Sequence, residues 1–269
     1  MGGYTRLGFI GGGNMAEALI KGLIKGDNDP KNIFVYDVDY DRQGRLKRDF
    51  GVEIAESNLE VIKNSQAVFL AVKPQHVNDV LHETADAFTD KHLLISIAAG
   101  VTISHLQAAI PASAPIIRAM PNTPALVLTG ATALAAGAFA EPAHMERAVE
   151  LFQSVGLAVE VDEKYMDIVT GLSGSGPAYV LMFLESLADG AVRMGLPRKE
   201  ATILAVQTIL GTAKLVLETG DHPAKLRDMV TSPGGTTAAG LHALEGGKFR
   251  HTVMEAVASA AKRSKELGG

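Results

Sequence analysis

The chain has 269 residues, with 25 Lys plus Arg against 30 Asp plus Glu, and a net charge of −5. This length suits one large domain or two smaller ones, and the acidic balance argues against a nucleic-acid-binding protein. The lack of cysteine excludes disulfides and thiolate chemistry, and no consecutive apolar run approaches the ~18 residues of a membrane helix. Because the N-terminus also lacks the apolar core of a signal peptide, we expect a soluble, cytoplasmic protein without a membrane partner.

A glycine-rich turn follows the first predicted strand, at residues 6–10. The turn reads Gly11-Gly12-Gly13-Asn14-Met15-Ala16, and helical spacing follows it. In this G-x-G-x-x-A pattern Gly11 permits a tight turn, Gly13 lets the backbone approach a pyrophosphate, and Ala16 lets helix and strand pack closely. The N-terminus of the helix favours phosphate through its free N–H groups and its dipole. An ordinary glycine-rich turn is the alternative, but the strand before and the helix after favour a dinucleotide site.

Apolar runs alternate with helical patterns up to about residue 161. Continuous apolar runs are typical of parallel strands that are covered on both faces. The expected strands are 33–36, 67–72, 93–97, 115–120 and 157–161, with closing strands within 125–140, and the expected helices are 58–64, 77–87, 102–109 and 142–154. This alternation predicts an α/β fold with a parallel sheet and helices on both of its faces.

The pattern changes near Asp162, and beyond it the sequence predicts only helices. The expected helices are 178–194, 198–219, 223–230, 237–244 and 249–267. They carry too few polar residues for the surface helices of a monomer, so we expect a partner subunit to cover them. A large monomeric bundle is the alternative. We therefore expect two domains, residues 1–161 and residues 162–269.

An acidic residue, Asp37, ends the second predicted strand. In dinucleotide-binding folds a carboxylate here accepts hydrogen bonds from the adenosine ribose and repels a 2′-phosphate, which favours NADH over NADPH. The alternative role is a helix cap, which Asp39 or Asp41 could equally fill. Arg42 and Arg45 could still reach a 2′-phosphate, so the preference for NADH is mild.

Candidate ligand-binding residues follow successive strands. Asn58 begins a helix, either as its cap or as a contact to the coenzyme. Lys73-Pro74 and Ala98-Ala99-Gly100 each follow a buried strand, at the edge where open α/β sheets bind ligands. Asn122 lies within Met120-Pro121-Asn122-Thr123-Pro124 and offers an amide near the expected nicotinamide. Each alone fits an ordinary loop, but one shared site explains them better together.

Two segments rich in glycine and serine interrupt the helical half, residues 172–178 and residues 232–237. The second segment offers hydroxyls and free N–H groups where a helix begins near Thr237, which suits a small carboxylate. The alternative for both segments is a helix–helix connector with ordinary caps.

Taken in order, these motifs resemble pyrroline-5-carboxylate reductase. The most specific are MPNTP at 120–124, SGSGPAY at 173–179 and SPGGTT at 232–237. The resemblance covers nearly the whole chain. It implies an N-terminal Rossmann domain with a doubly wound sheet, followed by an all-helical domain for dimerisation and substrate binding. It also implies homodimers, often assembled into decamers as pentamers of dimers.

The implied reaction is the reduction of 1-pyrroline-5-carboxylate to L-proline by NADPH or NADH, the last step of proline synthesis. Hydride would pass to a protonated cyclic imine. The chain departs from many relatives at Tyr36-Asp37-Val38, where a small or basic pair often receives the 2′-phosphate.

The resemblance and the motifs together identify candidate site residues. Thr237 is expected to donate a hydrogen bond, or relay a proton, to the ring nitrogen. The candidates for substrate binding are Ser175, Ser232, Gly234, Gly235, Thr236 and Thr237. The candidates for coenzyme binding are Gly11, Gly12, Gly13, Asn14, Met15, Asp37, Asn58, Val72, Lys73, Pro74, Ala99 and Asn122.

Two rival functions remain. A β-hydroxyacid dehydrogenase would place a catalytic lysine on the helix after the linker glycines, but residues 173–179 contain none. A regulatory protein that senses NAD(P) without turnover is disfavoured by the intact 232–237 segment. The histidines show no H-x-x-H spacing, so we expect no metal.

Overall fold

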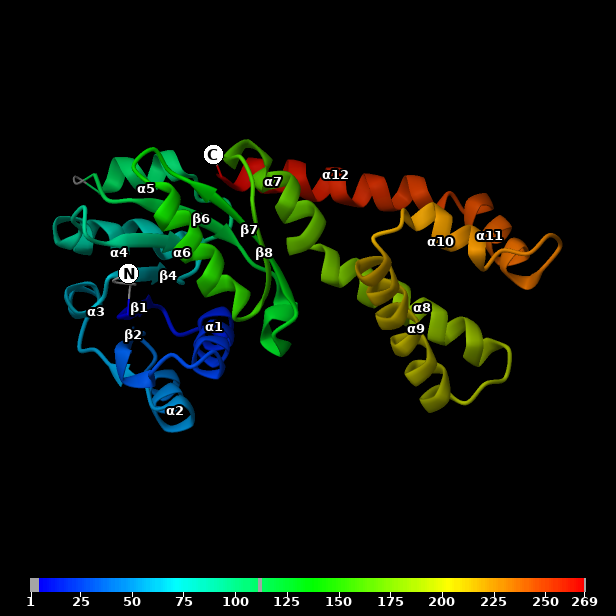
Figure 1. The fold of residues 1–269 in the computed structure, drawn as a ribbon, viewed down its shortest axis with the longest axis horizontal. Helices are drawn as coiled ribbons and strands as arrows, with labels where there is room; N and C mark the ends of the chain where they lie inside the picture. Colours follow the sequence, from blue (N-terminus) through cyan, green and yellow to red (C-terminus); the bar gives the residue numbers. More distant parts are fainter. Residues whose placement is uncertain (1–4, 111–112, 269) are drawn as a thin grey trace. The chain divides into compact units, whose positions relative to one another are not determined.

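The computed structural model describes residues 5–110 and 113–268 (Figure 1). The chain divides into two compact units, Met1–Ser175 with Ser259–Gly269, and Gly176–Ala258. The expected domain boundary after residue 161 thus falls where the sheet ends, whereas the contacts extend the first unit to Ser175 and return the C-terminal residues to it.

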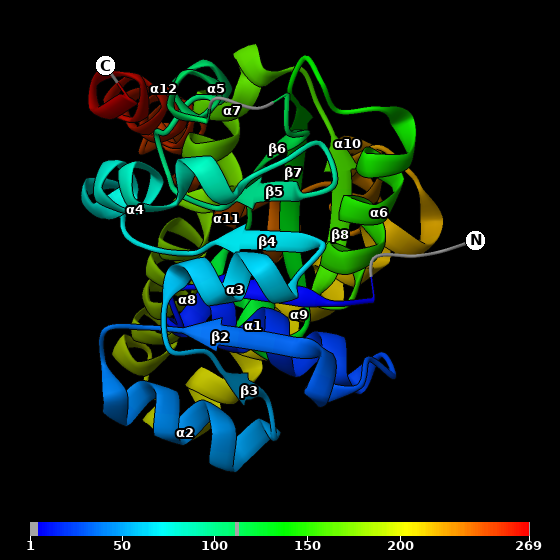
Figure 2. The ribbon, with the colours of Figure 1, turned by 90° about the vertical axis from the view of Figure 1, so that its left-hand side faces the viewer.

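Eight strands of the first unit form one sheet in the order β3-β2-β1-β4-β5-β6-β7-β8 (Figure 2). The strands are β1 Leu7–Ile10, β2 Ile33–Tyr36, β3 Glu53–Ile54, β4 Ala67–Leu70, β5 Leu93–Ser96, β6 Ile116–Met120, β7 Gly130–Ala136 and β8 Gly156–Glu160. Neighbouring strands are parallel, except that β7 runs antiparallel to β6. The predicted doubly wound α/β fold is confirmed, and the closing strands β7 and β8, which are parallel to each other, run opposite to the other six.

Helices cover both faces of this sheet, and each face has its own core. On one face Leu19 and Phe152 pack around Phe69, and on the other Ile62 and Leu106 pack with Leu70. Alternate residues of each strand reach opposite cores, as the twofold period of a strand requires. Helices α1 Asn14–Lys25, α2 Tyr40–Phe50 and α6 Pro142–Gln153 serve the first core, and α3 Asn58–Asn64, α4 Val77–Thr84, α5 Ile103–Ala109 and α7 Met166–Val169 serve the second.

Local capping explains where two of these helices begin. The Asp39 side chain accepts a hydrogen bond from the Arg42 N–H at 3.1 Å and caps α2. The Ser57 hydroxyl accepts one from the Glu60 N–H at 3.2 Å and caps α3. Asn58 is therefore the first residue within α3 and not its cap, and Asp37 is free of the capping role.

Two glycine-rich segments differ from their predicted form. Within 125–140 only β7 is a strand, because Thr123–Val127 forms a 3-10 helix. Residues 170–174 form a π-helical turn that continues into α8, so this part of the 172–178 segment is not an irregular break. The Ser175 N–H donates to the Thr170 carbonyl at 2.8 Å, which is the five-residue spacing of a π-helix.

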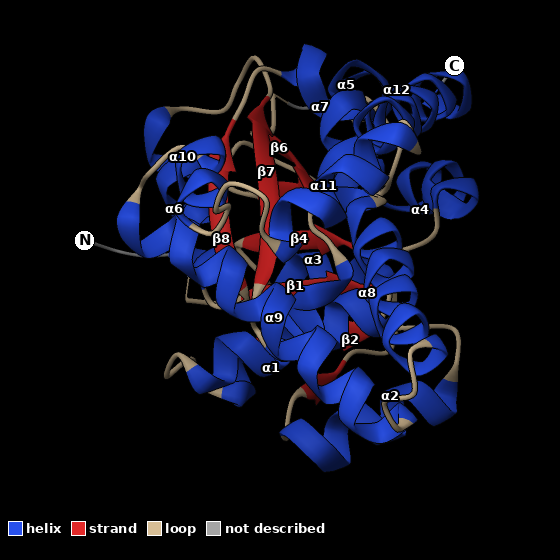
Figure 3. Ribbon diagram, turned by 90° about the vertical axis from the view of Figure 1, so that its right-hand side faces the viewer, coloured by secondary structure: helices blue, strands red, loops and turns tan. Residues whose placement is uncertain are grey.

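The second unit contains helices and no strand, and the structure describes all of its residues (Figure 3). The predicted helical half is thus confirmed. Its helices are α8 Gly176–Arg193, α9 Arg198–Thr219, α10 Pro223–Met229, α11 Thr236–Gly246 and α12 Phe249–Gly268, the last of which returns to the first unit at Ser259.

This unit buries little of its own apolar surface. Its buried cluster consists of Ala188, Ala201 and Ala205, whereas Leu181 is 63% exposed and Leu204 58% exposed. Helix α9 is also long and apolar enough to cross a membrane, by length and composition alone. The prediction from consecutive apolar runs missed this, because Gln207, Lys214 and several threonines interrupt the apolar residues of the helix. One such helix is a weak indication, since a helix that packs against a partner subunit passes the same test.

Candidate functional site

The carboxyl ends of β1, β2 and β4 meet where the strand order reverses. The Gly11 N–H donates to the Tyr36 carbonyl at 2.8 Å, and the Ala71 N–H donates to the Ile10 carbonyl at 2.8 Å. These bonds bring the glycine turn, the end of β2 and the loop after β4 to one edge. In open α/β sheets this switch point is where ligands bind.

Two glycines of the turn are present for different reasons: the protein backbone requires one, and open space lies in front of the other. Gly11 has a φ of +95°, and a Cβ there would lie 2.8 Å from the Ala71 carbonyl oxygen, so the backbone itself requires glycine. Gly13 has an ordinary φ of −69°, and a Cβ there meets none of the described atoms within 4 Å. The fold therefore does not need glycine at position 13, whereas a ligand in that space would.

The start of α1 faces this open space. Gly13 is its N-cap and has no side chain, so the first N–H groups of the helix lack intrahelical acceptors. A cavity of about 610 Å³ lies here, lined by the predicted residues Gly11, Gly13, Asn14, Met15, Asp37, Val72 and Lys73. A pyrophosphate fits this cradle by charge and by space.

The carboxylate of Asp37 is buried at the end of β2, with 7% of the residue exposed. One of its oxygens accepts from the Gly12 N–H at 2.7 Å and from Arg42 at 3.0 Å, and the other accepts from the Asp39 N–H at 2.9 Å. Burial alone would raise the pKa of Asp37, but these hydrogen bonds outweigh burial and hold that pKa below its usual value. Asp37 is therefore a fixed anion beside the turn.

The two arginines that could meet a 2′-phosphate are already paired. Arg42 contacts Asp37 at 3.0 Å and Asp39 at 3.7 Å, and Arg45 contacts Glu17 at 3.0 Å. Together with Arg48 they line a space of about 460 Å³ that adjoins the cavity at the turn, which Arg42 also lines. A phosphate there would have to compete with these carboxylates.

A second cavity of about 340 Å³ shares Gly11, Asp37 and Val72 with the cavity at the turn. Asn58 lines it, and the Asn58 amide donates to Glu83 at 3.0 Å. His76 lines both cavities but was not among the predicted residues. Its place in the loop after Lys73 was the available signal.

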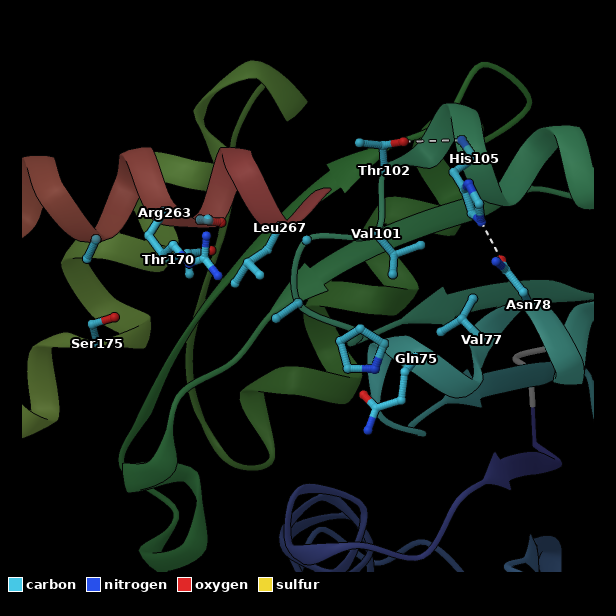
Figure 4. A pocket seen from close by; sticks show the side chains of 15 residues that line it. Gln75, Val77, Asn78, Val101, Thr102, His105, Thr170, Ser175, Arg263 and Leu267 are labelled. Carbon is cyan, nitrogen blue, oxygen red and sulfur yellow. Dashed lines mark hydrogen bonds between the residues drawn. The ribbon is translucent and has the colours of Figure 1, made fainter. Parts of the chain in front are cut away.

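A third cavity, of about 680 Å³, lies beside the loop after β5 (Figure 4). Of the predicted residues it brings together Pro74, Ala99 and Ser175. Sequence reasoning missed Arg263 and His105 in its lining, because α12 and α5 reach the cavity only through the fold. The His105 ring nitrogen Nε2 lies 2.6 Å from Oδ1, the side-chain amide oxygen of Asn78.

Asn122 uses its amide within the protein. The amide nitrogen donates to the Ser173 carbonyl at 3.0 Å, and the amide oxygen accepts from the Ala131 N–H at 2.8 Å. From the sequence, Asn122 is expected to contact the nicotinamide directly. In the structure its amide instead joins its own loop to the π-helical turn and to β7, all within the first unit.

The predicted carboxylate-binding segment lies in the second unit. Gly234 has a φ of +67°, and the Gly235 N–H donates to the Ser232 carbonyl at 3.0 Å, which closes a tight turn. Helix α11 then begins at Thr236, one residue earlier than expected, with Gly235 as its N-cap. The first N–H groups of α11, including those of Thr236 and Thr237, lack intrahelical acceptors and can bind an anion.

Comparison with known proteins decides the family. A family model for pyrroline-5-carboxylate reductase dimerisation matches residues 163–267, and one described as NADP oxidoreductase, coenzyme F420-dependent, matches residues 6–100. A pyrroline-5-carboxylate reductase from Synechocystis sp. is 48% identical over 98% of both chains. The chain belongs to the pyrroline-5-carboxylate reductase family.

Solved structures of this family share the fold along its whole length. The pyrroline-5-carboxylate reductase of Coxiella burnetii has a TM-score of 0.94 and 38% identity, with 98% of each chain covered. Pyrroline carboxylate reductase from Plasmodium falciparum, solved with NADP bound, has a TM-score of 0.88 and 35% identity, again over 98% of each chain. The resemblance drawn from the three motifs is therefore confirmed.

Proposed function

We propose that this protein reduces 1-pyrroline-5-carboxylate to L-proline with a reduced nicotinamide coenzyme, the last step of proline biosynthesis. The observation that carries the proposal is a phosphate cradle at α1 together with an anion-binding turn at α11, in a chain 48% identical to a pyrroline-5-carboxylate reductase. The cradle suits a dinucleotide, and the turn suits a small carboxylate.

The coenzyme-binding residues follow from the cavities of the first unit. Gly11 to Met15 would hold the pyrophosphate, and Asp37 would hold the adenosine ribose, with Asn58 on the adenine side. The residues after β4 and β5 would line the rest of the coenzyme, namely Val72, Lys73, Pro74 and Ala99. The buried anion at Asp37 and the paired arginines support a preference for NADH, because a 2′-phosphate would meet repulsion there.

The reaction requires the protein to position the substrate against the coenzyme and to supply one proton to the ring nitrogen. When bound, the reduced nicotinamide supplies a hydride to the imine carbon, which protonation of the ring nitrogen has already made electrophilic. Ser232 and the Gly234–Thr237 segment would orient the substrate through its carboxylate. The Thr237 hydroxyl would donate a hydrogen bond to the lone pair of the neutral imine nitrogen and relay a proton from solvent to it before the hydride arrives. Ser175 would line the substrate cavity.

We propose that the chain forms a homodimer, and that five such dimers can assemble into a decamer. The support is the exposed apolar surface of α8 and α9 and the match of residues 163–267 to a dimerisation model. A cytoplasmic location is part of this proposal.

Steady-state oxidation of NADH and NADPH in the presence of pyrroline-5-carboxylate tests this function. We expect coenzyme oxidation that depends on the imine and matches the proline formed. A β-hydroxy acid with oxidised coenzyme should give no reaction. Coenzyme binding without turnover would instead identify a nucleotide-sensing protein, and oxidation of the hydroxy acid would identify the rival dehydrogenase.

A further inference from the structure

The carbonyl of Ser173 lacks its usual helical partner for a reason that the sequence shows. In an α-helix the carbonyl of residue 173 would accept from the N–H of residue 177. Residue 177 is proline, which has no N–H. The Asn122 amide nitrogen, 3.0 Å from this carbonyl, supplies the missing donor.

Asn122 also has its other amide group fixed, so it cannot turn away. Its oxygen accepts from the Ala131 N–H at 2.8 Å, at the start of β7. The preceding strand adds a second contact, since a Cβ on Gly174 would lie 2.8 Å from the terminal methyl of Met120. The end of β6 and the π-helical turn are thus packed and hydrogen-bonded together.

This turn carries one wall of the 680 Å³ cavity. Thr170 and Ser175, which are joined by the π-type bond of 2.8 Å, both line the cavity, and Ala99 and Gly100 line it as well (Figure 4). π-helical turns are rare, and the Asn122 amide donates to a carbonyl within this one. The segment that carries Thr170 and Ser175 is therefore tied to the loop after β6.

We propose that Asn122 is a positioning residue: it replaces the N–H that Pro177 lacks, and thereby holds the π-helical turn in the form that places Thr170 and Ser175 in the cavity. The proposal rests on the proposed function in that the cavity is taken to hold the substrate at Thr170 and Ser175, beside the coenzyme at Pro74 and Ala99. It gives Asn122 a role in orienting the substrate rather than in binding the coenzyme.

The test is a pair of substitutions with a built-in rescue. Asn122→Asp keeps an oxygen for the Ala131 N–H but turns the donor toward Ser173 into an acceptor. Pro177→Ala restores a backbone N–H at residue 177. We expect Asn122→Asp to lower kcat roughly tenfold while the Kd for NADH, measured by its fluorescence, changes less than about twofold. The double variant should recover most of the lost kcat, and Pro177→Ala alone should resemble the wild type.

Three results would overturn the proposal. One is a wild-type kcat in Asn122→Asp. The second is a loss of NADH affinity as large as the loss of kcat, which would mean that Asn122 touches the coenzyme. The third is failure of Pro177→Ala to rescue. If Asn122→Asp does not fold, recovery of folding in the double variant supports the proposal, and an unfolded double variant contradicts it.

Hydrogen–deuterium exchange separates this inference from the proposed function. Exchange across residues 170–176 should rise in Asn122→Asp and return toward the wild-type level in the double variant, whether or not the protein reduces the imine. An inactive wild type with this exchange pattern would refute the proposed reaction and leave the role of Asn122 intact. An active wild type with unchanged exchange in Asn122→Asp would support the proposed reaction and refute the role of Asn122.

Discussion

At the residue scale, Asp37 is the clearest determinant of which coenzyme is used. Asp37→Asn keeps an oxygen for the Gly12 N–H but removes the charge that repels a 2′-phosphate and pairs with Arg42. We expect the ratio of kcat/KM for NADPH to that for NADH to rise roughly tenfold, or about 1.4 kcal/mol. Asp86→Asn, which removes the same charge at an exposed residue that lines none of these cavities, is the matched control. An unchanged ratio in Asp37→Asn would refute the assigned role.

The same carboxylate makes the stability of the fold depend on pH. The unfolded chain protonates Asp37 near pH 4, and the folded chain does so only at lower pH, because the folded pKa is lowered. Its contribution is therefore complete above about pH 4 and is lost as pH falls through the folded pKa. Urea unfolding followed by circular dichroism should show Asp37→Asn about 1–3 kcal/mol less stable at neutral pH, and a smaller gap at about pH 3. A gap that does not depend on pH would contradict this.

Thr237 carries the proposed hydrogen bond to the substrate nitrogen. We expect Thr237→Ala to lower kcat/KM for pyrroline-5-carboxylate by about a hundredfold, the lower end of the usual range for a proton donor. Thr237→Ser keeps the hydroxyl and should retain most of the activity. If Thr237→Ala stays near the wild-type value, another group protonates the nitrogen.

At the element scale, the start of α1 allows the effect of a substitution on folding to be measured apart from its effect on coenzyme binding. Gly13→Ala suits the backbone and meets none of the described atoms, so the melting temperature should fall only slightly, by the cost of a poorer helix N-cap. The added methyl enters the pyrophosphate space, so we expect the Kd for NADH to rise about tenfold or more. Gly44→Ala, equally unobstructed but on α2, should leave NADH binding as it is. Equal NADH affinity in Gly13→Ala would mean that the phosphates lie elsewhere.

Elements with local signals could be predicted from the sequence, and those that depend on distant contacts could not. Helices 58–64 and 198–219 match their predicted bounds because apolar spacing and flanking breakers define them locally. The sequence predicts a break within 172–178 where the structure begins with a π-helical turn, because its glycines and serines say nothing of the Asn122 amide that donates to the Ser173 carbonyl. Likewise, Ser264 of α12 donates to Asp167 at 2.7 Å, a contact 97 residues apart that no local pattern predicts.

The candidate site divides in the same way. The glycine turn, Asp37 and the residues after each strand could be named, because parallel strands bring their carboxyl ends to one edge. Arg263 and His105 could not be named, since neither belongs to a motif and only the packing brings them to the cavity.

At the scale of the whole molecule, the exposed apolar surface of α8 and α9 indicates that a second copy of the chain covers it. Leu181→Glu with Leu204→Glu places two charges on residues that are 63% and 58% exposed in the single chain. If a partner covers them, light scattering should show a lower mass for this variant than for the wild-type dimer or decamer. Lys199→Ala, on the same helix, should leave the mass unchanged. A wild-type monomer in dilute solution would contradict the proposed assembly.

The central claim is hydride transfer to the imine carbon of pyrroline-5-carboxylate, and isotope tracing tests it most directly. NADH carrying deuterium at C4 of the nicotinamide ring, on the face that is transferred, is incubated with enzyme and imine, and the product is examined by NMR. The account predicts L-proline with one deuterium at C5, and markedly less product from Thr237→Ala. The labelling is repeated with deuterium on the other face of the nicotinamide ring. Proline without deuterium from both labelled forms of NADH, or no proline at all, would contradict the account.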